Sequence, residues 1–183
     1  MNISLKKGFT LIETLVAVTI LMVAIAGPLT VAMKAYTASL DARNQTIATN
    51  LAQETMEYLN NIKDNSNKSN GKDGFNYSSN KCDSSSHPCD ISVYHDNSGK
   101  LDNYVDCSSS MSNCRLYNSD SYGYNHNTGM SSTADNKLTP FTRYFYLTDL
   151  TDPQVLATVV VSWNTGSTAN SVTLQEVLSN TTR

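Results

Sequence analysis

The chain has 183 residues, enough for one domain and an anchor but too few for two full domains unless both are small. Its formal net charge of -3 provides no basic surface across the chain as a whole, so the composition does not support nucleic-acid binding. Apolar residues are concentrated at the two ends, and the middle is rich in Ser, Asn, Asp, Gly and Tyr. We therefore expect one folded domain joined to an apolar N-terminal segment.

Residues 1–34 combine a polar leader with a candidate membrane span. Residues 1–8, MNISLKKG, end in two lysines and a glycine, and residues 9–34 follow as a largely apolar segment. From Leu15 to Met33 the chain is almost entirely apolar, and these 19 residues at about 1.5 Å per residue match the ~30 Å core of a bilayer. Because Lys6 and Lys7 precede the span, the positive-inside rule places the N-terminus in the cytoplasm and the rest of the chain outside.

Residues 35–63 predict an amphipathic continuation of the same helix. Apolar residues recur on one face, and the segment contains no Gly or Pro; these residues are Leu40, Ile47, Leu51, Tyr58 and Ile62. We therefore expect one long helix from Phe9 to about Lys63, which Pro28 kinks rather than ends.

The polar middle, residues 64–140, predicts mostly irregular structure with short strands around Val93 and Tyr104. Six tyrosines lie between Tyr77 and Tyr124 among Ser, Gly and Asn, a composition typical of recognition loops. The alternative is a solvated loop region that only shields the sheet.

All four cysteines lie in this middle region, as two C-x6-C pairs: Cys82 with Cys89, and Cys107 with Cys114. An even count in a loop-rich segment behind a membrane anchor indicates disulfides formed in an oxidising compartment. We favour the two local pairings because each closes a short loop. Zinc is the competing interpretation, but six intervening residues exceed the two to four of most zinc knuckles.

The C-terminal region, residues 141–183, predicts an antiparallel meander. Three segments are rich in β-branched or alternating apolar residues, namely residues 142–150, 155–163 and 171–178, and the stretch NTGSTAN between the last two is a turn by composition. One face of such a sheet needs cover, and the apolar face of the helix can supply it. The predicted fold class is α+β, with the long N-terminal helix packed on a C-terminal antiparallel sheet.

Glu13 lies near the start of the apolar segment, where a charge is costly. A carboxylate at the centre of a spanning helix costs roughly 2.5 to 3.5 kcal/mol on insertion scales, so we expect Glu13 to have a partner or a function. Gly8 leaves the backbone accessible to a protease, and Phe9 begins the apolar segment. The stretch KKGFTLIETLVAVTIL resembles the class III signal of type IV pilins and of the pseudopilins of type II secretion, with its basic leader, Gly, Phe and Glu in the family order.

The resemblance implies cleavage between Gly8 and Phe9 by a membrane-embedded prepilin peptidase, followed by N-methylation of the new Phe9 amine. It implies that Glu13 meets the positive N-terminus of a neighbouring pilin subunit during assembly. It also implies a pilin-like fold, a single pass through the inner membrane with the head outside, and later extraction by the pilus assembly machinery into an extracellular pilus or a periplasmic pseudopilus.

The helix sequence is more similar to minor pilins of the modification subclass than to major pilins. Pro28 lies slightly earlier than the helix-kinking proline of many major pilins, which leaves the position of any melted stretch open. The predicted function is a structural and assembly subunit, with a pseudopilin and a tip adhesin that uses the Tyr-rich disulfide loops as alternatives. The ligand of such an adhesin is unknown.

Other interpretations of the N-terminal segment are open from the sequence. Thr10-x-x-Glu13 is a capping-box pattern, in which Glu13 bonds the backbone at the helix start. Ala24-Ile-Ala26 matches a secretory cleavage site, although Glu13 interrupts the apolar region that such a signal needs. A plain single-span anchor is the third alternative.

No catalytic set, cofactor site or metal site is predicted. We expect His87, His95 and His126 to be surface residues of polar loops, and no serine has the context of a nucleophile. Residues 96–102, DNSGKLD, fail the acidic alternation of a calcium loop. We therefore predict that the protein is not an enzyme.

Overall fold

The computed structural model describes residues 10–70, 82–91, 104–119, 123–126, 137–150 and 154–179. The chain divides into two compact units, Met1–Arg43 and Asn44–Arg183. Helix α1, Leu11–Asn70, contributes residues to both.

In the first unit, the described part of α1 is almost entirely exposed. Every described residue from Thr10 to Ser39 is exposed, including large apolar side chains such as Val23 at 75%. Pro28 lies inside the helix and does not end it. A proline there removes one backbone donor, and the neighbouring Thr30 hydroxyl donates to the carbonyl oxygen of Gly27 at 2.8 Å.

In the second unit, α1 buries one face. Its buried residues recur at helical spacing and are Ala48, Leu51, Ala52, Thr55, Met56, Leu59 and Ile62. The helix ends at Asn70 rather than near Lys63, so the predicted end was too early. Residues 64–70, DNSNKSN, are polar but contain neither Gly nor Pro, and a helix breaker comes only with Gly71.

The sheet is antiparallel and seven-stranded, and β5 lies at its centre. Strand β5, Lys137–Asp149, pairs with β6, Gln154–Thr165, which pairs with β7, Thr168–Ser179. The predicted meander is therefore confirmed, with longer strands than the sequence indicated. The other edge of β5 pairs with β3, Arg115–Ser119, and with β1, Cys89–Ile91.

The polar middle is more ordered than predicted. In addition to β1 and β3 it contains β2, Tyr104–Asp106, β4, Gly123–Asn125, and a 3₁₀ helix η1, Met111–Cys114. β2 pairs with β1, and β4 pairs with β3. The predicted strand at Tyr104 is present, whereas Val93 lies outside the described residues. These strands are too short to give a period-2 signal in the sequence.

The turn between β6 and β7 explains the glycine in NTGSTAN. Thr165 pairs with Thr168, so the loop has two residues, and Gly166 takes a φ of +61°. A positive φ at the first central position belongs to a two-residue hairpin turn of type II′, where glycine is favoured. The turn sets the register that runs along the whole β6–β7 ladder.

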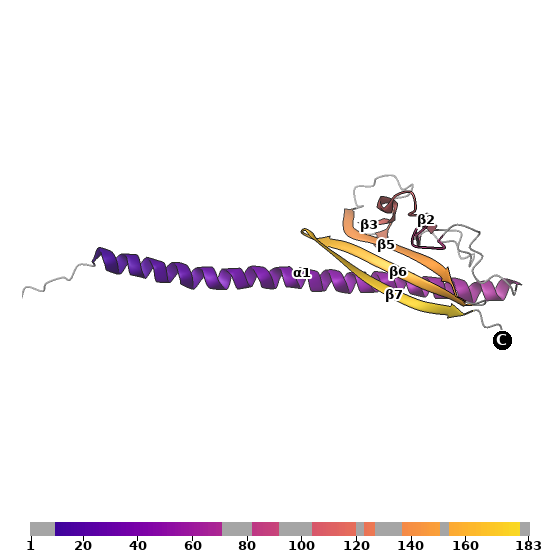
Figure 1. The fold of residues 1–183 in the computed structure, drawn as a ribbon, viewed down its shortest axis with the longest axis horizontal. Helices are drawn as coiled ribbons and strands as arrows, with labels where there is room; N and C mark the ends of the chain where they lie inside the picture. The colour runs from indigo at the N-terminus through magenta and orange to yellow at the C-terminus, as the bar shows by residue number, and fades with distance from the viewer. Residues whose placement is uncertain are drawn as a thin grey trace, which may run out of the picture. The chain divides into compact units, whose positions relative to one another are not determined.

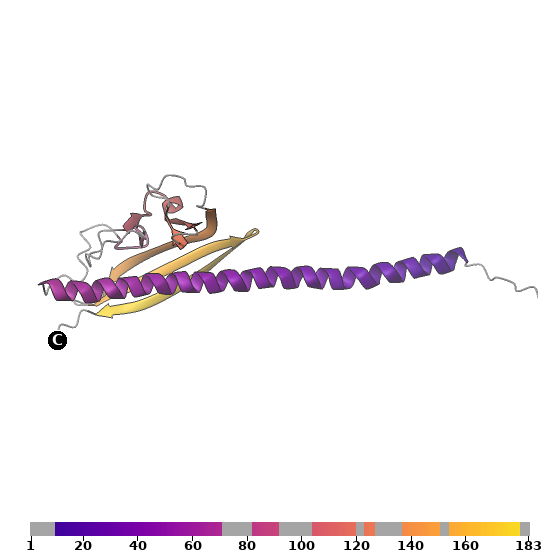
Figure 2. The ribbon, with the colours of Figure 1, turned by 180° about the vertical axis from the view of Figure 1, so that it is seen from behind.

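The hydrophobic core of the second unit lies between the sheet and the C-terminal part of α1 (Figure 1; Figure 2). Figure 2 shows the helix in front of the strands, and Figure 1 shows it behind them. Cross-strand pairs such as Phe145–Val159 point toward α1 and are fully buried. The α+β class and the helix-on-sheet arrangement predicted from the sequence are confirmed.

Candidate functional site

The start of α1 is capped by Thr10. The Glu13 backbone N–H donates to the Thr10 carbonyl oxygen at 3.0 Å and, at 3.4 Å, to the Thr10 hydroxyl oxygen. Within the described residues, the Glu13 carboxylate makes no hydrogen bond or ion pair. Only the threonine half of the capping box is therefore formed, and the carboxylate remains available to a group outside the described part of the chain.

The surface that follows Glu13 is apolar on all sides. Within residues Leu11–Asp64 of α1, an 18-residue window reaches a mean hydropathy of 2.4 and none of it is buried, so by length and composition the helix could cross a membrane. A helix that is apolar all round needs lipid or other helices around it.

The hydroxyl groups in this apolar segment bond back to the helix itself. The Thr14 hydroxyl donates to the Leu11 carbonyl oxygen and the Thr19 hydroxyl to that of Val16, each at 2.8 Å. A polar group in hydrocarbon is costly unless it is hydrogen-bonded. These contacts let the segment carry threonines without exposing an unsatisfied donor to lipid.

The remaining predicted residues of this site, Lys6, Lys7, Gly8 and Phe9, lie outside the described residues. Of the residues to which a processing or assembly role was assigned, Glu13 alone has a described position.

A second cluster of functional groups lies in the core of the second unit, and the sequence analysis missed it. Arg143 on β5 is fully buried, and its Nε donates to Oδ1 of Asp90 on β1 at 2.8 Å. Its Nη1 donates to Oε2 of Glu54 on α1 at 3.0 Å. One guanidinium therefore joins three elements of the fold, namely β5, β1 and α1.

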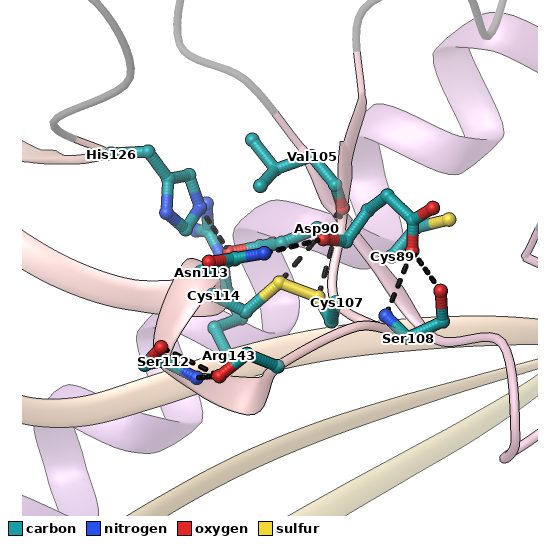
Figure 3. Close-up of a disulfide and its surroundings, with 12 residues drawn as sticks. Cys89, Asp90, Val105, Cys107, Ser108, Ser112, Asn113, Cys114, His126 and Arg143 are labelled. Carbon is teal, nitrogen blue, oxygen red and sulfur yellow. Dashed lines mark hydrogen bonds and ion pairs between the residues drawn. A yellow bond between two sulfur atoms is a disulfide. The ribbon is translucent and has the colours of Figure 1, made fainter.

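Asp90 is itself fully buried and accepts three hydrogen bonds. Besides Arg143, its Oδ1 accepts from the Ile91 backbone N–H at 2.8 Å, and its Oδ2 is hydrogen-bonded to Nε2 of His126. Several hydrogen-bond donors around a buried carboxylate offset the free-energy cost of burying its charge. Figure 3 shows His126, Asp90 and Arg143 together in this cluster.

His126 corrects one prediction. It was expected on the surface, but it is 4% exposed because its ring packs against Asp90. His87 agrees better with expectation, with half of its side chain exposed, and His95 lies outside the described residues. The sequence around His126 is polar on both sides, which is why composition placed it in a solvated loop.

Two disulfides lie next to β1, which carries Asp90, and to its partner strand β2. Cys82 is bonded to Cys89, with Cα atoms 5.2 Å apart, and Cys107 to Cys114, with Cα atoms 5.6 Å apart. These are the local pairings that the sequence analysis favoured. Both sulfur atoms of the second disulfide lie near the Val105 carbonyl oxygen, and Val105 pairs with Asp90 across the β1–β2 ladder (Figure 3).

The cluster resembles a structural ion-pair network more than a reaction centre. Arg143 and Asp90 have no exposed surface, so a substrate has no access to them. Among the residues that the structure describes, no three His, Cys, Asp or Glu side chains are placed to hold a metal ion.

Comparison with protein families gives one match, in the segment that Glu13 belongs to. Residues 3–27 match the model described as the prokaryotic N-terminal methylation motif. Comparisons with curated proteins and with solved structures give no match. The chain thus carries the prepilin-type N-terminal methylation motif at the head of a long apolar helix, which is consistent with a type IV pilin-like protein.

Proposed function

We propose that this chain is a minor subunit of a type IV pilus or a related filament. In this proposal residues 1–8 are a leader, and prepilin peptidase cleaves between Gly8 and Phe9 before the new amine is methylated. Residues 9–34 anchor the precursor in the inner membrane and later pack in the filament core. Residues 35–63 and the sheet form the head, with the N-terminus of the precursor, and its Lys6 and Lys7, in the cytoplasm.

The observation that carries the proposal is the methylation motif on a helix whose apolar side chains are exposed among the described residues. The head has a core of its own, built from residues beyond Arg43, so the first unit is not needed to complete it. An apolar helix attached to such a head suits two successive surroundings, first lipid and then the helices of other subunits.

Glu13 has a defined role in this proposal. Cleavage creates an ammonium group at Phe9 of a neighbouring subunit, and in a medium of low dielectric constant its attraction to a carboxylate is strong. The Glu13 carboxylate has no partner within the described residues, so no contact with any of them has to break first. We propose that this pair guides the docking of each incoming subunit.

The processing step is tested by intact mass and N-terminal sequencing of the protein purified from membranes. We expect a mature chain that begins at Phe9 and carries one methyl group. A chain that begins at Gly27, as a secretory signal at Ala24-Ile-Ala26 would give, or one that keeps Met1, contradicts the proposal.

The role of Glu13 is tested by Glu13→Val, with Glu57→Val as the matched control on the exposed side of the same helix. We expect Glu13→Val to insert in the membrane at least as well as the native chain but to be lost from sheared filaments, while Glu57→Val is incorporated normally. Normal incorporation of Glu13→Val would leave helix capping as the better account of this residue.

A pseudopilin of type II secretion remains the main alternative, because the same motif and helix serve both machines. The two are separated by where the processed protein is found. Recovery in extracellular filaments supports a pilus subunit, and recovery in short periplasmic assemblies supports a pseudopilin.

A tip adhesin that uses the Tyr-rich loops has less support from the described residues. Tyr104 and Tyr124 pack against the core, and Tyr124 makes an edge-on contact with Phe141 at 6.1 Å between ring centroids. These rings stabilise the fold rather than offer a contact surface. Deleting residues 77–124 would remove strands that pair with β5, so adhesion is better tested with point variants of the exposed surface.

A further inference from the structure

The outer face of the sheet carries a small cavity that lies outside the segment proposed for processing and assembly. It has a volume of about 240 Å³ and lies beside η1, where β3, β5 and β6 meet. Figure 1 shows this end of the sheet, where β5 begins and the β6–β7 turn lies. Ligand pockets usually start near roughly 300 Å³, so the cavity suits one small ring rather than an extended ligand.

Cross-strand register explains why polar side chains meet there. Arg115 on β3 lies opposite Thr142 on β5, and Thr142 lies opposite Ser162 on β6. Residues directly opposite one another in antiparallel strands project from the same face. The neighbours of this row, Arg143 and Val161, point to the core, so the row points to the other face.

The polar groups of this row are free to bind a ligand. Arg115 is exposed, and within the described residues its guanidinium has no ion-pair partner. The Thr142 and Ser162 hydroxyls and the Asn164 amide, which also line the cavity, make no side-chain hydrogen bond to described residues. A guanidinium binds a carboxylate through two parallel hydrogen bonds, and hydroxyl and amide groups both donate and accept.

Apolar side chains complete the lining. The Met111 and Pro140 side chains border the cavity. Trp163, the single tryptophan of the chain, also borders it, but this residue is 6% exposed and packs in the core beneath the cavity. A sugar ring presents hydroxyl groups at its edge and C–H groups on its face, which matches a lining of this mixed kind.

We propose that this cavity binds one carboxylated sugar unit, such as a hexuronate, with Arg115 on the carboxylate and the Thr142, Ser162 and Asn164 side chains on the ring hydroxyls. The site goes beyond the proposed function, because it requires neither processing nor assembly. It gives the head a means to contact acidic glycans at a surface.

The test uses the full-length protein in a non-ionic detergent and follows Trp163 fluorescence together with the single indole N–H resonance of Trp163. Sodium glucuronate is titrated at constant ionic strength. Glucose, which has the ring without the charge, and sodium acetate, which has the charge without the ring, are titrated in the same way. We expect a saturable change with glucuronate and much weaker changes with the other two. Arg115→Gln should weaken binding at least roughly tenfold, since it removes the charged hydrogen bonds.

Arg43→Gln is the matched control, because it removes the same charge from an exposed site on the first unit. It should leave the glucuronate titration unchanged. An equal response to acetate would mean that the site binds any small anion. An equal response to glucose would mean that Arg115 does not recognise the carboxylate. Either result, or unchanged binding by Arg115→Gln, overturns the proposal.

Discussion

Replacing Arg143 by methionine is expected to destabilise the head strongly. Methionine keeps much of the length of the side chain but removes the hydrogen bond to Asp90, which has no exposed surface. Removing one partner of a buried ion pair costs about 3 to 5 kcal/mol, because the other charge stays in a medium of low dielectric constant. Asp90 keeps its contacts with His126 and the Ile91 backbone, which is why we expect destabilisation rather than complete unfolding.

For a unit of this size, the loss corresponds to a fall in Tm of roughly 10 °C or more. It can be measured by thermal unfolding of the full-length protein in detergent, followed by Trp163 fluorescence. Trp163 is 6% exposed and belongs to the core of the second unit, so its signal reports on the head and not on the apolar segment.

Glu54→Gln is the matched control in the same network. The Glu54 side chain is 54% exposed, so its ion pair with Arg143 is screened by solvent and contributes only about 0 to 1 kcal/mol. A Glu54→Gln variant as unstable as Arg143→Met would refute the reasoning from burial. So would strict additivity in the Asp90→Asn/Arg143→Met double variant, because two residues of one network should cost less together than the sum of their single effects.

Two further predictions concern the disulfides and alkaline pH. Replacing both cysteines of either disulfide by serine should lower the free energy of unfolding by about 2 to 3 kcal/mol, because the unfolded chain is no longer closed into a loop. Loss of the Cys82–Cys89 disulfide should destabilise more than loss of Cys107–Cys114, because Cys82 and Cys89 belong to the hydrophobic core. Equal falls in Tm for the two variants would contradict this ranking. Burial, with a smaller contribution from the neighbouring Tyr146, raises the pKa of the Tyr144 phenol above 10. Above pH 10 the unfolded state therefore releases a proton that the folded state retains, and the free energy of unfolding should fall as pH rises. Tyr144→Phe should reduce this loss, measured as Tm against pH, and an unchanged pH dependence would show that Tyr144 does not contribute.

Much of the fold was predictable because its signals are local. Apolar residues on all sides of one segment and on one side of the next predict the two parts of α1, and β-branched alternation predicts β5, β6 and β7. The helix end was placed too early, since polar residues without Gly or Pro do not stop a helix that is already formed. The three-residue strand β4 was missed because it pairs through tertiary contacts rather than through a pattern of its own.

The candidate sites also differ in whether their signal is local in the sequence. The methylation motif is contiguous, so KKGFTLIE was enough to identify the motif without any structure. The network around Arg143 joins residues separated by 36, 53 and 89 positions, and none of its pairs leaves a mark in the local sequence. The cavity beside Arg115 likewise depends on the register of three strands. The apolar part of the helix and the methylation motif at its start can be read from local sequence. The set of charges that are buried together follows from the tertiary structure, because burial depends on contacts between residues far apart in the chain.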